Sequence, residues 1–184
     1  ICILDGQLVT DELHLEAHKE GNEVLANPAE DILKLAVIER HHGTGNIGIG
    51  FVKGFGFSGG ALASTVGHDA HNVAVVGDND EDMFIAAQAL GEVGGGQCVA
   101  SNGKVTAMLP LPIAGLMSDA APETVIQQQH DVLNAAHQLC CKMEDPFMPL
   151  SFLPLSVIPS LKLSDLGLVN VNQFKIVSLG VDNE

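Results

Sequence analysis

Residues 31–82 constrain the fold of this chain more than any other part of its sequence. Short apolar runs alternate there with glycine-rich turns, and the stretch contains half of the 20 glycines. It also holds the only arginine, Arg40, and four of the eight histidines: His41, His42, His68 and His71. Loops carried by a rigid scaffold commonly present reactive side chains in this way. We therefore predict that the functional site lies in this stretch and that the rest of the chain mainly supports it.

The pattern of apolar residues predicts short strands mixed with a few helices. Strands are expected at residues 1–4, 8–15, 47–52, 61–66, 72–76, 97–100, 105–109, 169–171 and 174–179. Residues 32–38 could form a short helix that runs into a strand. Asn79 is a good N-cap for a helix that ends at residues 94–96. The longest helix is predicted at residues 119–139. Asn102-Gly103 predicts a tight hairpin turn. Strands and helices do not follow a strict βαβ order, so we predict an α+β or mixed α/β fold, with a mixed β-sheet, a few packed helices and no complete TIM barrel.

A length of 184 residues fits one domain spanning residues 1–184. Within it, residues 1–30 are expected to form a linker or edge strands, and residues 31–184 the core. The chain opens on a strand-like run at Ile1–Leu4, with no initiator methionine and no signal peptide. We therefore expect it to be the back part of a longer protein.

The charge balance excludes several classes of partner. The chain has 8 basic and 23 acidic residues and a formal net charge of −15, so neither nucleic acid nor an anionic membrane surface is expected to bind it. No apolar run reaches the roughly 18 residues of a membrane span, which predicts a soluble protein. The cysteine usage favours a cytoplasmic location. Four cysteines without a C-x-x-C motif are expected to be reduced and buried rather than to form disulfides or a zinc site.

Two groups of polar residues are candidates for a site. The first is His68-x-x-His71, with Asp69 between the histidines and Asn72 after them. These side chains could ligate a metal or contact a substrate, or they could be structural histidines that bond to the backbone. Two histidines alone do not identify a metal site, because zinc normally takes three or four protein ligands.

The second group is Glu39-Arg40-His41-His42, which offers a charged, hydrogen-bonding cluster at the end of an apolar run. An ion pair of Arg40 with Glu39 or with a distant acid is the structural alternative. Adjacent side chains of a strand point in opposite directions, so His41 and His42 can face one pocket only if the backbone bends. Residues 43–45, Gly-Thr-Gly, make such a bend plausible.

Four blocks of sequence carry a family resemblance: DILKLAVIERHHGTGNIGIGFVKGFG, GALASTVGHDAHNVAVVGDNDEDM, LPLPIAGLMSD and MEDPFMPLSFLPLSVIPSLKLSDLGLV. In this order they resemble the C-terminal domain of bacterial adenine deaminase, from the amidohydrolase superfamily, over about residues 10–177. The resemblance implies hydrolysis of adenine to hypoxanthine and ammonia in purine salvage, with divalent manganese or iron held in an upstream barrel domain. This chain has no H-x-H motif of the kind that opens such a metal site, so no metal is expected in this fragment alone.

The resemblance also implies a role for the two polar groups. They would help to close the pocket of the upstream barrel around adenine, and the fragment alone would be inactive, with no catalytic residue assigned. The first choice for this role is His68, Asp69, His71 and Asn72, and the second is Glu39, Arg40, His41 and His42. Family members usually have alanine where Gly67 stands and serine where Ala70 stands; both changes leave the first four residues in place.

Two other hypotheses remain open from the sequence. The domain could be purely structural or mediate oligomerisation, and a homo-oligomer is expected. Alternatively, it could be an independent metal-binding domain that uses His41, His42, His68 and His71 together.

Overall fold

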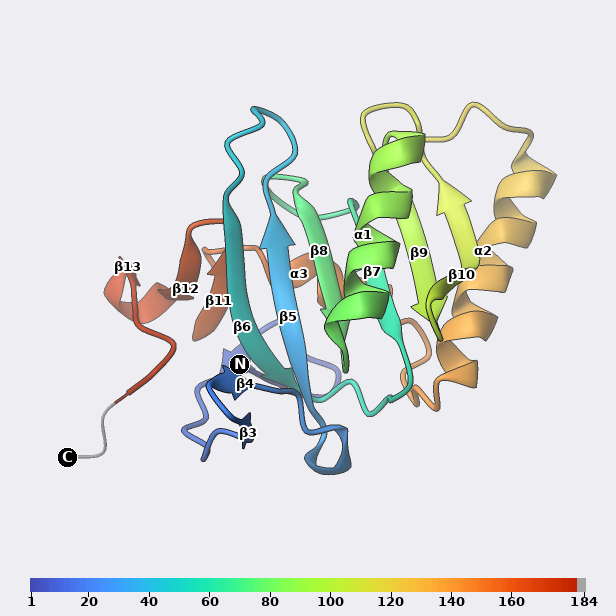
Figure 1. The fold of residues 1–184 in the computed structure, drawn as a ribbon. Coiled ribbons are helices and arrows are strands. Elements are labelled where there is room, and N and C mark those ends of the chain that lie inside the picture. The colour runs from blue at the N-terminus through green and yellow to red at the C-terminus, as the bar shows by residue number, and fades with distance from the viewer. Residues whose placement is uncertain (182–184) are drawn as a thin grey trace.

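The computed structural model describes residues 1–181, and its main feature is an eight-stranded sheet (Figure 1). The strand order is β10-β9-β7-β8-β5-β6-β1-β2, and neighbouring strands run antiparallel except for β1 and β6. The strands are β1 (Cys2–Ile3), β2 (Thr10–Asp11), β5 (Ile32–Ile38), β6 (Ile47–Lys53), β7 (Ala61–Ser64), β8 (Val73–Gly77), β9 (Gly96–Ser101) and β10 (Lys104–Pro110). The predicted mixed sheet without a closed barrel is confirmed.

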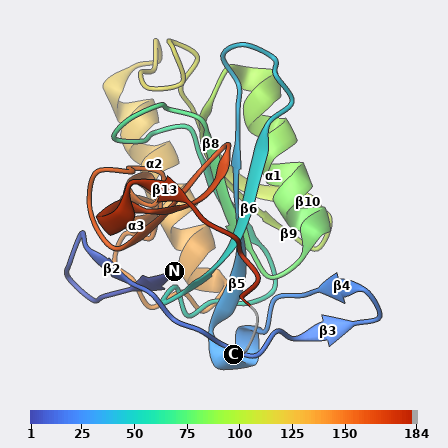
Figure 2. The ribbon, with the colours of Figure 1, turned by 90° about the vertical axis from the view of Figure 1, so that its left-hand side faces the viewer.

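The two faces of this sheet are covered by different elements (Figures 1 and 2). Helix α1 (Asp80–Val93) packs on one face, and α2 (Pro122–Gln138), α3 (Phe147–Phe152) and a three-stranded sheet pack on the other. The small sheet consists of β11 (Leu161–Ser164), β12 (Gly167–Asn170) and β13 (Lys175–Ile176). A separate hairpin pairs β3 (Lys19–Glu20) with β4 (Glu23–Val24), and two 3-10 turns, η1 and η2, span Pro28–Glu30 and Val171–Gln173. Within residues 1–181, no helix is both long and apolar enough to cross a membrane.

Successive side chains of the central strands point alternately to the two faces of the sheet, and both faces are therefore apolar and covered. In β7, Ala61 and Ala63 point toward α1, whereas Leu62 points into the larger core beneath α2 and α3. The α1 side uses small residues because the helix lies close to the sheet. At Gly77 of β8, for example, a Cβ atom would stand 2.6 Å from the Met83 side chain.

Local signals in the sequence predicted α1 and the hairpin β9–β10 well. The Asn79 side chain accepts a hydrogen bond from the Asp82 amide at 2.8 Å, and Gly94 ends the helix with φ of 84°. Asn102 and Gly103 have φ of 54° and 75°, the left-handed backbone that a two-residue hairpin requires. Both predictions are confirmed.

The terminal segments differ from the predicted strands. The strand expected at residues 8–15 is only Thr10–Asp11, and the one expected at residues 174–179 is only Lys175–Ile176. Thr10 exchanges backbone hydrogen bonds with Pro159 and Ser160, a long-range pairing that fixes one residue rather than a run. Phe174 has φ of 50°, which breaks the extended backbone before β13. Strand β11 and helix α3 were not predicted: the sequence between residues 145 and 159 is rich in prolines, and β11 follows it directly.

A buried lysine fastens the N-terminal segment to the small sheet. Lys162 of β11 is fully buried, and its Nζ donates a hydrogen bond to the Leu8 carbonyl at 3.1 Å. Burial lowers the pKa of this amine to about 8. The segment around Leu8 is therefore held by a charged hydrogen bond from a residue that is far away in the sequence.

All four thiols are free, as expected. Two of them, Cys98 and Cys141, are buried. Burial raises the pKa of the Cys98 thiol to about 12, so this thiol is unreactive at neutral pH. The prediction that all four are buried was wrong for Cys140, which is exposed, and for Cys2, which is half-buried.

Candidate functional site

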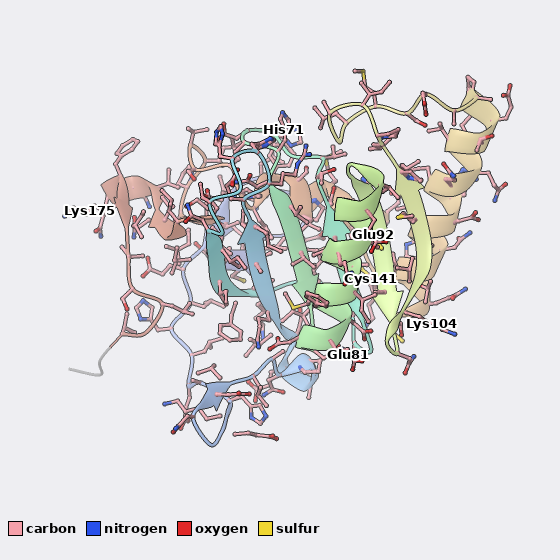
Figure 3. The ribbon with its side chains drawn as sticks, turned by 45° about the horizontal axis from the view of Figure 1, so that its top comes forward. His71, Glu81, Glu92, Lys104, Cys141 and Lys175 are labelled. Carbon is pink, nitrogen blue, oxygen red and sulfur yellow. The ribbon has the colours of Figure 1, made fainter. Side chains whose placement is uncertain are left out.

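Three connections meet at one end of the large sheet and bring the two predicted polar groups together. They are residues 39–46 between β5 and β6, residues 65–72 between β7 and β8, and residues 111–117 after β10; we call them the loop cluster. The strand register fixes this arrangement, because Ile38 pairs with both Ile47 and Val73, and Pro110 pairs with Gly96 at the same end. In Figure 3, His71 lies among these loops, at the end of the sheet.

Arg40 ties the three connections together. Its Nε donates a hydrogen bond to the His71 carbonyl, and its Nη2 donates one to the Ala114 carbonyl, each at 2.6 Å. Arg40 makes no ion pair with any acid among residues 1–181, so the alternative of a salt bridge with Glu39 was wrong. The fit is tight, since a Cβ atom at Gly115 would stand 2.5 Å from Nη2.

Thr65 joins the second of these connections to the third and to the start of β9, and the sequence did not reveal this role. Its side chain is buried, donates a hydrogen bond to the Gly115 carbonyl at 2.7 Å and accepts one from the Gly96 amide at 2.7 Å. The only signal in the sequence is a threonine that directly follows the buried run of β7. Its partners lie 31 and 50 residues away, so local sequence could not identify them.

Glu39 organises the bend that was predicted at residues 43–45. Its carboxylate accepts hydrogen bonds from the backbone amides of His41, His42 and Thr44, and from the Thr44 hydroxyl at 3.2 Å. These bonds, the Thr44 amide first, lower the pKa of Glu39 to about 2. The bend turns the chain sharply, so His41 and His42 no longer alternate as they would along a strand.

We expect Glu39→Gln to remove part of the acid sensitivity of this domain. A carboxyl whose folded pKa lies near 2, below its ordinary value of 4.5, stabilises the fold fully above pH 4.5 and loses that contribution as the pH falls toward 2. Urea unfolding at several pH values between 2 and 7 measures the effect. The variant should be less stable than wild type at pH 7, and the difference should shrink as the pH falls. Parallel pH curves for the two proteins would contradict this assignment.

Two of the predicted histidines use their rings to hold loops. The His68 ring stacks on Phe152 of α3 at a centroid distance of 3.7 Å, and its Nδ1 lies 3.0 Å from the Ser151 hydroxyl. The His41 Nε2 lies 2.6 Å from the Ala70 carbonyl and so connects the first two loops. Both rings therefore have structural partners inside the domain.

Other members of the predicted groups retain unused polar atoms. His42 and Asp69 are exposed, and neither the His42 ring nor the Asp69 carboxylate makes a hydrogen bond or ion pair within residues 1–181. His71 adopts a left-handed backbone, with φ of 52°, and its Nδ1 is buried without a partner. The Asn72 Oδ1 is also buried without a partner. An imidazole and a carboxylate of this kind can accept, donate or transfer protons.

The loop cluster presents these groups on a surface and does not form a cation site by itself. Nowhere in residues 1–181 do three His, Cys, Asp or Glu side chains gather closely enough to hold a metal ion. Two hollows in the molecule lie elsewhere. One, of about 1020 Å³, is lined mainly by residues 12–19 and 177–181, and one of about 310 Å³ lies beside the start of α1.

Comparison with known proteins assigns this chain to a family. The family model described as adenine deaminase C-terminal domain matches residues 7–175. An adenine deaminase of Desulfatibacillum aliphaticivorans is 52% identical over 179 residues, which cover 97% of this chain and 32% of that protein. An adenine deaminase of Oleidesulfovibrio alaskensis is 51% identical over 97% of this chain and 31% of that protein. Adenine deaminase 1 of Rhizobium etli is 47% identical over 96% of this chain and 31% of that protein. The chain thus spans about a third of the length of these relatives. It belongs to the adenine deaminase C-terminal domain family.

Proposed function

We propose that this domain helps to close the active site of an adenine deaminase, over an amidohydrolase barrel that precedes it in the full-length protein. The observation that supports this proposal best is the loop cluster. It gathers exposed histidine and carboxylate groups at one end of the sheet, in a chain whose relatives are named adenine deaminases. The enzyme would convert adenine and water to hypoxanthine and ammonia in purine salvage, in the cytoplasm.

The chemistry explains what such a domain can contribute. Hydrolysis requires water to attack the amidine carbon of the purine and a proton to reach the departing ammonia. The divalent metal, manganese or iron, would belong to the barrel, because the described residues of this chain do not form a site for it. The exposed His42 and Asp69 can hydrogen-bond to the purine edge or carry a proton, while Arg40 and Glu39 hold the loops that present them.

We expect Asp69→Asn and His42→Ala to lower adenine turnover by the full-length enzyme about 10-fold or more, because positioned acid–base groups contribute about 10²–10⁴-fold. Both residues are exposed and lack partners within residues 1–181, so thermal stability should stay unchanged. Initial rates across a range of adenine concentrations and of pH measure the effect. His130→Ala, at an exposed histidine on the outside of α2, is the matched control and should keep wild-type rates. Unchanged kinetics in both test variants would refute the proposed role.

A structural or oligomerisation domain is the second candidate, and one observation favours it. Glu39, Arg40, His41 and His68 direct their polar atoms to the loops or helices of their own domain. If this is their whole function, His68→Ala in the full-length enzyme should lower the unfolding temperature but leave the KM for adenine unchanged. A raised KM at unchanged stability would exclude this second candidate.

A further inference from the structure

Strand β6 exposes an apolar face that no other part of residues 1–181 covers. Helix α1 lies over β7–β10, whereas the same face of the sheet over β5 and β6 carries no helix (Figure 1). Ile47 and Ile49 point outward there and are each 52% exposed. Phe84 of α1 is 66% exposed. It lies one helical turn after Asp80, which forms an ion pair with Lys34 of β5, so Phe84 is on the side of α1 next to β5. We call the exposed Ile47, Ile49 and Phe84, together with the half-buried Ile38 and Phe51 beside them, the β6 surface.

The edge of β6 beside this face is also open. At its C-terminal end, β6 pairs with β1: the Ile1 nitrogen donates to the Phe51 carbonyl at 2.8 Å, and the Lys53 amide donates to the Ile1 carbonyl at 2.9 Å. Backbone groups of alternate residues point to the same side of a strand, so those of Ile49 and Ile47 point to this edge as well. Within residues 1–181, no strand pairs with them. An open edge beside an apolar face is a typical place for another strand to add.

We propose that the polypeptide preceding this domain in the full-length protein docks on the β6 surface and that its last residues extend β1 along the open edge of β6. This inference rests on the proposed function and specifies where the upstream domain sits. This chain matches a C-terminal domain and covers only 32% of the length of a relative. Most of that relative's sequence therefore precedes the matching domain. Because β1 runs parallel to β6, residues before Ile1 would continue toward Ile49 and Ile47.

A second copy of this chain fits the surface less well. Two copies would each bring a net charge of −15 to the contact, and like charges disfavour association. The upstream polypeptide is covalently joined to the chain beside the open edge, so its effective concentration there is high. Its binding does not have to overcome repulsion between two equally charged copies.

Docking on the β6 surface would also bring the loop cluster to the upstream domain. Ile38 and Ile47 are the residues immediately before and after the connection 39–46, which carries Glu39 and His42. A domain seated on these isoleucines would therefore reach the polar loop at its margin. The exposed side chains of that loop would then face the partner rather than bulk water.

Hydrogen exchange in the full-length protein tests the inference. Within residues 47–53, the amides of residues 47 and 49, which point away from β5, should be protected in the wild type, and Ile49→Asp should raise their exchange about 10-fold or more by opening the contact. The same variant should let a protease cut between the domains. Ile126→Asp, at an isoleucine on the outside of α2 that is 57% exposed, is the matched control and should leave exchange of the amides of residues 47 and 49 unchanged.

Three results would overturn the inference. These are fast exchange of the amides of residues 47 and 49 in the wild type, equal effects of Ile126→Asp and Ile49→Asp, or a wild-type dimer that Ile49→Asp converts to monomer without exposing the interdomain link. The last result would assign the surface to a second copy. The proposed function fails separately: if His42→Ala and Asp69→Asn leave turnover unchanged while Ile49→Asp still raises the exchange of these amides, docking stands and pocket closure does not.

Discussion

Arg40→Met is expected to lower the free energy of unfolding of the domain by about 2–4 kcal/mol, because hydrogen bonds from charged groups contribute about 1.5–3 kcal/mol each. The guanidinium donates to the carbonyls of His71 and Ala114, and methionine keeps much of the side chain's length without either donor. Both carbonyls then lose their partner, so the second and third connections of the loop cluster should separate from the first, which carries Arg40. Chemical denaturation measures the loss, and hydrogen exchange at residues 65–72 and 111–117 locates it.

Two further variants sharpen this prediction. Arg40→Lys keeps the charge but replaces the planar fork with a single ammonium, so it should recover less than half of the lost stability. Lys104→Met removes a positive charge from an exposed residue at the start of β10, and should change stability by no more than about 0.5 kcal/mol. If Arg40→Met and Lys104→Met behave alike, Arg40 does not hold the loop cluster together.

Gly48→Ala should destabilise the domain by about 3 kcal/mol and lower its melting temperature by about 6–12 °C, at the upper end of the range for overpacked cores. An alanine Cβ on this part of β6 would lie 1.9 Å from the Ser164 carbonyl oxygen and 3.1 Å from the Gly167 nitrogen. Both obstacles are backbone atoms, so the hairpin of β11 and β12 has to move away from the large sheet. That movement uncovers Leu163, which is fully buried in the core.

The matched control for this variant is Gly50→Ala, two residues further along the same face of β6. There the new Cβ would meet only the Leu163 side chain, at 3.4 Å, and that side chain can shift. Alanine also restricts the unfolded chain more than glycine does, which favours folding by about 0.4–1 kcal/mol. Calorimetry should therefore find Gly50→Ala within about 1 kcal/mol of the wild type. Equal losses at the two glycines would show that the hairpin does not need the close approach at Gly48.

The features that the sequence predicted best are those encoded by neighbouring residues. Asn79 and Gly94 delimit α1 because capping involves residues within one turn of the helix end, and Asn102-Gly103 forms its hairpin for the same local reason. Strand β11 was missed because it is stabilised by distant partners: Leu163 packs against Gly50, and the Lys162 amine bonds to Leu8.

For the candidate site, residue types were informative and partners were not. Both polar groups were predicted from histidines, charges and glycines that are close in sequence, and their roles toward a substrate remain predictions. What each side chain bonds to could not be read in this way, because Arg40 reaches carbonyls 31 and 74 residues away rather than its neighbour Glu39. Carbonyl acceptors belong to every residue, so the sequence does not distinguish one from another.

The sequence by itself determined the mixed fold class, the caps and turns of its local elements, and the stretch in which the candidate site lies. The tertiary structure alone decided that two polar groups about 30 residues apart meet at one end of a sheet, and that Arg40 and His41 join them there. It also decided that β6 keeps an open face and edge within residues 1–181. The physical reason is the range of the interactions. Capping and turn preferences act over a few residues, whereas strand order and buried hydrogen bonds depend on which distant segments pack together.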